Sequence, residues 1–232
     1  MKKYKLNKGI LIAIEGIDGA GKTTQVRMLS EYFKHKGIDV VTFKEPTDGE
    51  YGQKIKVISR FGRHTVTPME EFEIFLQNRI EDCRINIIPA LEQNKLVIMD
   101  RYYFSNIAYQ SVLGVNKEYI IKRNEEIAVI PDLVLILDVA VKIGLSRIIH
   151  NRKEEHNHFE KEEYLDKVRQ VFLSLKDSYI QIIDGTQTED FVFSNLKNIV
   201  QDIIAPHKTE DVSQIDLFES RFQNSEMAYF KN

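Results

Sequence analysis

The sequence has little of what marks secreted, membrane or nucleic-acid-binding proteins. Cys83 is the only cysteine, so no disulfide can form within the chain, and we expect a reducing compartment. No apolar run approaches the ~20 residues that cross a bilayer, and the basic segment at residues 1–5 is not followed by the apolar core of a signal peptide. The formal net charge of −3 gives no electrostatic reason to expect contact with nucleic acid or a membrane. We therefore expect a cytoplasmic protein.

The chain does contain enough apolar residues for a sizeable core, since 43% of its 232 residues are hydrophobic. Short apolar runs alternate with longer amphipathic stretches, which is typical of an α/β fold with a doubly wound parallel sheet and helices on both faces. Thr67, followed by Pro68, is a good N-cap for one long helix. The runs predict strands over 10–14, 40–43, 96–99, 133–139 and 180–183, and helices over 22–36, 51–59, 68–93, 105–113, 117–128, 141–151, 160–176 and 188–204.

The regular pattern ends after Ile204, where acidic and polar residues become interleaved with isolated aromatics. We therefore predict a single domain over 1–204 and an extended C-terminal tail over 205–232.

A glycine-rich segment between the first strand and the first helix carries the main chemical signal. Residues 16–24 read Gly-Ile-Asp-Gly-Ala-Gly-Lys-Thr-Thr, a complete Walker A pattern in its expected strand–loop–helix setting. Glycines let backbone N–H groups turn toward a phosphate, and the helix N-terminus adds positive charge. Lys22 then reaches the β- and γ-phosphates, and the Thr23 hydroxyl can bind Mg²⁺.

A second polar pair follows the strand at 96–99. Asp100 comes at the carboxyl end of that strand, where ligands bind in open α/β sheets. It could hold Mg²⁺, and its neighbour Arg101 could clamp an acceptor phosphate with two hydrogen bonds. A local salt bridge between the two is the alternative interpretation.

Seven segments in order resemble the thymidylate kinase family, P-loop enzymes that transfer the γ-phosphoryl group of ATP to dTMP with Mg²⁺. The resemblance implies a five-stranded doubly wound parallel sheet of the P-loop NTPase type with a mobile lid, and a role in dTTP synthesis. The segments are 15–24, 44–49 (Lys-Glu-Pro-Thr-Asp-Gly), 75–79 (Phe-Leu-Gln-Asn-Arg), 100–105 (Asp-Arg-Tyr-Tyr-Phe-Ser), 108–110, 131–138 and 183–187.

For the thymine base, the resemblance implies contacts on one helix and on the segment after Asp100. Phe75 would stack on the ring, and Arg79, one helical turn later, would donate to a base carbonyl. Ser105 and Gln110 would lie near the base edge, where an amide can satisfy a carbonyl and an N–H together.

For the sugar and the acceptor phosphate, the resemblance implies a second group of residues. Tyr102 and Tyr109 would form the wall beside the sugar, and Arg101 would bind the phosphate. Asp18, inside the phosphate loop, matches the family's carboxylate near the acceptor. Lys44 departs from the arginine that the family often has before Glu-Pro, so its expected phosphate contact lacks the planar guanidinium.

The lid is expected at about 147–160. The loop offers no cation beyond Lys22, so the resemblance implies a transition-state cation from the lid. We predict Arg152 for that role, with Arg147 or Lys153 as alternatives, and a solvated charged turn at 152–155 is the interpretation without a catalytic role. His158 stands where the family usually has arginine, so charge there would depend on pH. The predicted ATP-binding residues are Gly16, Gly19, Gly21, Lys22, Thr23, Thr24, Arg147 and Gly185.

Two other functions remain open from the sequence. A deoxynucleoside kinase acting on thymidine would need a carboxylate base at the 5′-hydroxyl, whereas Arg101 and Lys44 favour an acceptor that already carries phosphate. A P-loop switch or binding protein would leave Phe75, Arg79 and Gln110 without a role.

Two partners are also expected. The resemblance implies a homodimer, for which the helix over 68–93 could present the paired face. In the tail, residues 214–218 (Gln-Ile-Asp-Leu-Phe) resemble the peptide by which bacterial proteins dock on the DNA sliding clamp. The alternative is that these apolar side chains pack on the chain's own domain or on a dimer mate.

Overall fold

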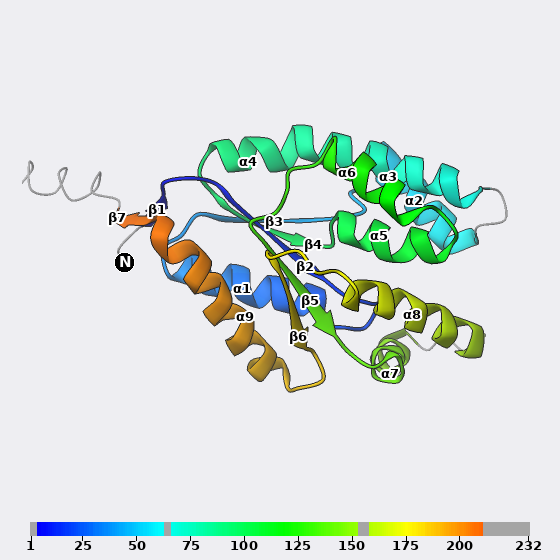
Figure 1. Cartoon of the computed structure of the whole chain (residues 1–232). Coiled ribbons are helices and arrows are strands. Elements are labelled where there is room, and N and C mark those ends of the chain that lie inside the picture. The colour runs from blue at the N-terminus through cyan, green and yellow to red at the C-terminus, as the bar shows by residue number, and fades with distance from the viewer. Residues whose placement is uncertain (1–3, 63–65, 153–157, 211–232) are drawn as a thin grey trace, which may run out of the picture.

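A five-stranded parallel sheet forms the centre of the computed structural model, which describes residues 4–62, 66–152 and 158–210 (Figure 1). The order β3-β4-β2-β5-β6 places the first strand of the sheet in the middle, so the chain winds first to one edge and then to the other. This is the doubly wound topology that the sequence predicts. The strands are β2 (Ile10–Glu15), β3 (Val40–Lys44), β4 (Leu96–Asp100), β5 (Leu133–Asp138) and β6 (Ile180–Asp184).

Helices cover both faces of the sheet. In Figure 1, α1 and α9 lie together on one face and α3 to α6 lie on the other, while α7 and α8 form a pair beyond the end of β5. The helices are α1 (Lys22–His35), α2 (Glu50–Phe61), α3 (Pro68–Asp82), α4 (Ile88–Glu92), α5 (Tyr103–Val112), α6 (Lys117–Glu125), α7 (Val141–Arg152), α8 (His158–Leu173) and α9 (Glu189–Ile204). In the part of the chain that the structure describes, no helix is both long and apolar enough to cross a membrane.

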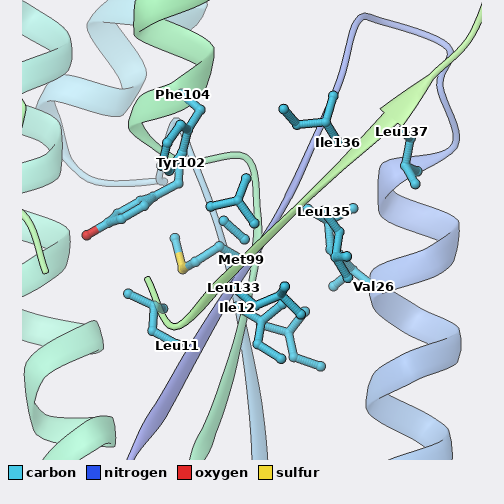
Figure 2. Packing of buried hydrophobic residues seen from close by; sticks show 14 of the residues in the cluster. Leu11, Ile12, Val26, Met99, Tyr102, Phe104, Leu133, Leu135, Ile136 and Leu137 are labelled. Atoms are coloured by element: carbon cyan, nitrogen blue, oxygen red, sulfur yellow. The ribbon is translucent and has the colours of Figure 1, made fainter. Parts of the chain in front are cut away.

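The core explains why the strands read as continuous apolar runs. β2, β4 and most of β5 are buried on both faces, as parallel strands between two helical layers must be. Figure 2 shows sheet residues such as Met99 and Leu135 between Val26 of α1 and the rings of Tyr102 and Phe104. Glu15 and Asp100 are the last residues of β2 and β4, so these acidic side chains lie together at the carboxyl ends of otherwise apolar strands.

The predicted helix over 68–93 is present over 68–92, but its middle is a π-helix rather than an α-helix. It starts as expected, because Thr67 and Glu70 form a capping box in front of Pro68. It then changes to a π-helix, η1 (Cys83–Ile87), before α4. Ile88 donates its backbone N–H to Cys83, five residues earlier. Pro89 lacks the N–H that an α-helix would require there, and the wider turn accommodates this loss.

A small antiparallel sheet at the far end of the molecule was not expected from the sequence. β1 (Tyr4–Leu6) pairs with β7 (Lys208–Glu210), which follows the short 3₁₀ helix η2 (Ala205–His207). The start of the predicted tail is therefore held against the N-terminal strand, at the end of the central sheet opposite the carboxyl ends of its strands (Figure 1). The rest of the tail, with residues 214–218, lies outside the described residues.

Candidate active site

The glycine-rich loop lies between β2 and α1, at the carboxyl edge of the sheet. Gly16 and Gly19 have φ angles of +135° and +80°, which favour glycine. Space also requires them, because a Cβ atom would lie 2.5 Å from the Leu137 carbonyl at Gly16 and 2.1 Å from the Gly144 carbonyl at Gly19. The loop thus packs tightly against β5 and α7 while it curls in front of α1. This is the cradle that a phosphate needs.

Lys22 is buried at the start of α1, beside the loop. Its Nζ donates to the carbonyls of Gly16 (3.0 Å) and Ile17 (2.7 Å). Burial and the nearby Arg101 charge together lower the pKa of this ammonium to about 7, although Asp18 and Asp100 oppose the change. The protonated lysine is therefore costly in this place, and an anion in the loop would stabilise it.

Thr23 and Asp100 form the oxygen-rich part of the site. The Thr23 hydroxyl donates to Asp100 Oδ2 at 2.5 Å, and Lys44 Nζ lies 3.6 Å from the same oxygen. Hard oxygen ligands from one hydroxyl and one carboxylate fit Mg²⁺, which takes few protein ligands and completes its shell with phosphate and water. Lys44, predicted to contact the acceptor, lies on this side of the site.

The phosphate loop opens into a cavity of about 730 Å³. Arg147 lies in its wall, where Nη2 donates to the Gly185 carbonyl at 3.1 Å and Nη1 to the Gly19 carbonyl at 3.4 Å. Gly16 is buried and does not line the cavity. The residues predicted for the ATP side that do line it are Gly19, Gly21, Lys22, Thr23, Thr24, Arg147 and Gly185.

A second, smaller pocket of about 190 Å³ lies between α2, α3 and α5. It shares Asp18 and Arg101 with the larger cavity. The two spaces therefore adjoin at these two side chains. The structure brings together here all the residues predicted for the acceptor side except Lys44, namely Asp18, Phe75, Arg79, Arg101, Tyr102, Ser105, Tyr109 and Gln110.

Arg101 occupies the junction in an unusual backbone conformation, with φ of 73°. Its Nη2 pairs with Asp18, and its Nη1 donates to the Ser105 hydroxyl at 3.1 Å and to the Gly16 carbonyl at 3.3 Å. Burial disfavours its charge, yet Tyr109 and the carboxylates of Asp18 and Glu15 outweigh that effect and raise the pKa of Arg101. A permanent cation is thus held between the two spaces.

Glu15 is a site residue that the sequence analysis did not assign. It is fully buried at the end of β2, and its carboxylate accepts from the Tyr102 backbone N–H (2.7 Å) and the Ser105 hydroxyl (2.7 Å). Burial raises the pKa of Glu15, although the Arg101 charge lowers it in part. Glu15 thereby fixes the start of α5 and, through Ser105, the guanidinium of Arg101. The sequence pattern that could have identified Glu15 as a site residue is its position as a single acidic residue directly after the apolar run 10–14.

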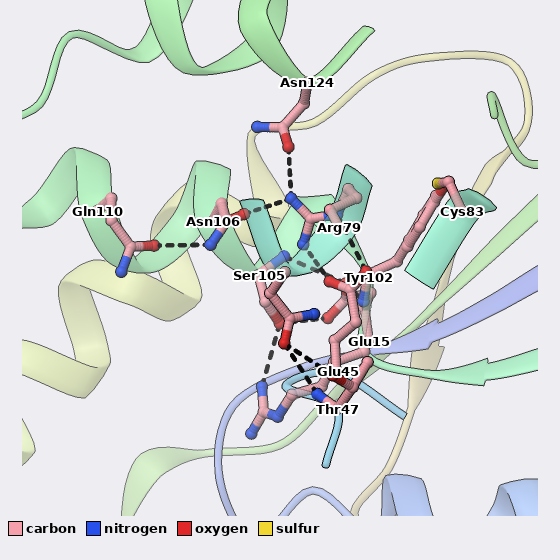
Figure 3. A network of polar contacts seen from close by, with 12 residues as sticks. Glu15, Glu45, Thr47, Arg79, Cys83, Tyr102, Ser105, Asn106, Gln110 and Asn124 are labelled. Atoms are coloured by element: carbon pink, nitrogen blue, oxygen red, sulfur yellow. Dashed lines mark hydrogen bonds and ion pairs between the residues drawn. The ribbon is translucent and has the colours of Figure 1, made fainter. Parts of the chain in front are cut away.

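Arg79 is also more deeply buried than a residue on a pocket wall needs to be, with 1% of its surface exposed. It pairs with both carboxylate oxygens of Glu45 and donates to Asn106 and Asn124 (Figure 3). Burial raises the pKa of Glu45 to about 7, while Arg79 opposes the rise. The sequence analysis missed Glu45, Asn106 and Asn124, because their roles depend on contacts between distant segments.

The lid is only partly described. Arg152 is the last residue of α7, and its side chain, like residues 153–157, lies outside what the structure describes. The same holds for the side chain of His158, which starts α8. The role of Arg152 stays a prediction.

Comparison with known proteins agrees with this arrangement. The family model described as thymidylate kinase matches residues 14–196. A thymidylate kinase from Desulfotalea psychrophila is 46% identical over 198 residues, which cover 85% of this chain and 94% of that protein. A probable thymidylate kinase from Archaeoglobus fulgidus is 42% identical, and the match covers 84% of this chain and 96% of that protein. A thymidylate kinase from Xylella fastidiosa is 38% identical, and the match covers 84% of this chain and 88% of that protein. The chain belongs to the thymidylate kinase family.

Proposed function

We propose that this chain transfers the γ-phosphoryl group of ATP to dTMP with Mg²⁺, giving dTDP for dTTP synthesis. The observation that carries the proposal is the meeting of a large cavity at the phosphate loop with a small pocket at Asp18 and Arg101. A nucleoside triphosphate fits the large cavity, and a nucleoside monophosphate fits the small pocket with its phosphate toward Arg101. The two reacting phosphates would then face each other across the junction.

On the donor side, the loop and Lys22 bind the β- and γ-phosphates, and Thr23 and Asp100 would hold Mg²⁺. The ion, when bound, neutralises charge on the phosphate oxygens. Arg147 and Gly185 border the place of the adenine. These residues position and neutralise the reactants, which is most of what phosphoryl transfer requires.

On the acceptor side, Arg101 neutralises and orients the phosphate of dTMP, and Ser105 and Gly16 hold the guanidinium in place. Phe75, Tyr102 and Tyr109 enclose the nucleoside. An arginine at the attacking group suits a phosphate better than a hydroxyl, because a 5′-hydroxyl needs a base rather than a cation. Arg152 supplies the further cation that stabilises the transition state.

Dependence on the metal is tested by measuring dTDP formation with Mg²⁺ and with excess EDTA. We expect activity only with the metal, and Asp100→Asn should raise the Mg²⁺ concentration needed for half-maximal rate. Full activity in EDTA, with rates unchanged in Asp100→Asn, would contradict the assignment of Thr23 and Asp100.

We infer a cytoplasmic homodimer as the working form. Exposed apolar side chains on the α3–α4 segment support this assignment, since such a group favours a self-complementary contact. They are Met69, Ile80, Ile85 and Ile88.

We further propose that residues 214–218 dock on the DNA sliding clamp. The pattern joins a glutamine amide for a polar pocket to Leu217 and Phe218 for an apolar one. The pairing of β7 with β1 places Glu210, the last described residue, at the end of the sheet opposite the phosphate loop. Titrating labelled full-length protein with the host clamp should give saturable binding that is lost in Leu217→Ala/Phe218→Ala. Equal behaviour of the two proteins would end this proposal.

A further inference from the structure

Arg101, the cation between the two cavities, contacts one neighbour from the phosphate loop and another from α5. Its Nη2 pairs with the carboxylate of Asp18. Its guanidinium also lies over the ring of Tyr109, with the guanidinium carbon 5.6 Å from the ring centroid. The position of Arg101 therefore depends on the contacts that fix Asp18 and on those that fix Tyr109.

Helix α7 fixes the phosphate loop at Asp18. Gly144 of α7 lies so close to the loop that a Cβ atom there would stand 2.7 Å from the Asp18 carbonyl oxygen. Three residues later, on the same side of the helix, Arg147 donates to the Gly19 carbonyl at 3.4 Å. A side chain at 144 would meet backbone, which cannot turn aside, so either α7 or the loop would have to move. The Asp18 carboxylate would move with the loop, and Arg101 with it.

Helix α8 fixes Tyr109 from another direction. Tyr164 packs edge-on against the Tyr109 ring, with the ring centroids 6.3 Å apart, and its hydroxyl donates to the Tyr109 carbonyl at 3.4 Å. Phe172 also packs edge-on against Tyr109, at a centroid distance of 6.4 Å. Such ring pairs hold a side chain in one orientation, so α8 determines where the ring beside Arg101 lies.

The two helices reach the neighbours of Arg101 as one attached pair. They pack together beyond the end of β5 (Figure 1). Arg169 of α8 forms a two-bond ion pair with Asp138, the last residue of β5, with Nε–Oδ1 at 2.5 Å and Nη2–Oδ2 at 2.8 Å. Only Val139 and Ala140 separate Asp138 from the start of α7. The same strand end therefore anchors both helices, and a two-bond pair fixes direction as well as distance.

We propose that Gly144 and Tyr164 are positioning residues for Arg101, with Gly144 acting through Asp18 and Tyr164 through Tyr109. The α7–α8 pair thereby places the cation that receives the acceptor phosphate, although neither residue lines the two cavities. This inference rests on the proposed function, in which Arg101 binds the phosphate of dTMP. Changes at either residue should weaken binding of the phosphate more than binding of the nucleoside.

The test measures the affinity of the full chain for dTMP and for thymidine, by titration calorimetry and by competition with dTMP. The two ligands share base and sugar, so the dissociation constant for thymidine divided by that for dTMP isolates the contribution of the phosphate. Gly144→Ala adds the colliding Cβ atom, and Ser146→Ala is its matched control, because Ser146 is an exposed residue on the same helix. Tyr164→Leu removes the ring, whereas Tyr164→Phe keeps it. Thermal unfolding checks that each variant is folded.

We expect this ratio to fall about 10-fold in Gly144→Ala and in Tyr164→Leu, as for a weakened hydrogen bond between charged groups. It should keep its unmodified value in Ser146→Ala and Tyr164→Phe. A ratio that is unchanged in a folded Gly144→Ala or Tyr164→Leu, including one in which both ligands weaken equally, would overturn the assignment of that residue. If Gly144→Ala does not fold, Tyr164→Leu decides. If the unmodified chain binds dTMP no more tightly than thymidine, the proposed function fails instead.

Discussion

Three cationic side chains at this site each contact a carbonyl or carboxylate oxygen that a bound phosphate could replace. Lys22 donates to two backbone carbonyls, Arg101 pairs with Asp18, and Lys44 lies near Asp100. Each cation is thus held by a partner that carries less charge than a triphosphate. An incoming phosphate can replace these partners without moving the side chains far, which is the preorganisation that electrostatic catalysis requires.

The low pKa of Lys22 predicts proton uptake when ATP binds. With a pKa of about 7, Lys22 is mostly neutral at pH 8, and the phosphates of ATP should return its pKa toward the ordinary value of 10.5. Binding at pH 8 should therefore take up close to one proton, whereas at pH 6 the group is already charged and uptake should be small. Calorimetry in buffers of different ionisation enthalpy measures the number of protons.

Lys22→Ala is the control for this measurement and for the loop as a whole. The variant should lose the proton uptake, bind ATP more weakly and show no measurable transfer. Near-normal turnover in the folded variant would refute the phosphate-loop assignment, and unchanged uptake would refute the role of Lys22 in it.

Site residues that a local motif places can be predicted from the sequence, whereas residues that act through tertiary contacts cannot. Lys22, Asp100 and Arg101 are predictable, because local motif and strand position determine their place. Glu45, Asn106 and Asn124 are not, since each acquires its role only by meeting Arg79 from a separate element. The expectation that Gln110 offers both a donor and an acceptor to the base stays a prediction, because Oε1 accepts from Asn106 and an amide oxygen can accept a second hydrogen bond.

At the scale of elements, the five central strands are predictable because buried apolar runs bounded by polar residues have few other interpretations. β1 and β7 are not, since three-residue strands that include lysines carry no such pattern. The π-helical turn within 68–93 lies directly before Pro89, and the missing N–H of that proline is visible in the sequence.

The predicted lid, over about 147–160, carries the next prediction. Arg152→Ala should lower kcat by roughly 10³- to 10⁵-fold if its guanidinium acts on the transferring phosphoryl group, with a much smaller change in the KM for dTMP. Steady-state kinetics with each substrate varied in turn gives both constants.

Arg147→Ala and Lys153→Ala are the comparisons. Arg147 bonds to Gly19 and Gly185, so its loss should mainly raise the KM for ATP. A harmless Arg152→Ala together with a large loss of kcat in Lys153→Ala would place the catalytic cation one residue further along.

On the scale of the whole molecule, the two cavities and the small β1–β7 sheet lie at opposite ends of the central sheet. Both cavities lie at the carboxyl edge of the sheet, and β1 and β7 close the other end (Figure 1). The apolar residues of the α3–α4 segment occupy a third region, on the outside of one helical layer. The proposed dimer face therefore lies apart from both substrate cavities.

Self-association is tested by light scattering. The chain has a mass of 27.1 kDa, and we expect a particle of twice that mass at micromolar concentration. Ile85→Lys, which places a charge on the α3–α4 face, should shift the protein toward the monomer, because desolvating an unpaired charge is costly. A monomeric unmodified chain would contradict the proposed dimer.

The central claim is that the junction at Asp18 and Arg101 receives an acceptor that already bears a phosphate. The most direct test is a coupled assay of ATP consumption with dTMP, with thymidine and with no acceptor. We predict rapid turnover that depends on dTMP, little with thymidine, and only slow hydrolysis without an acceptor. Turnover with thymidine that equals or exceeds turnover with dTMP, or hydrolysis that no acceptor stimulates, would contradict the account.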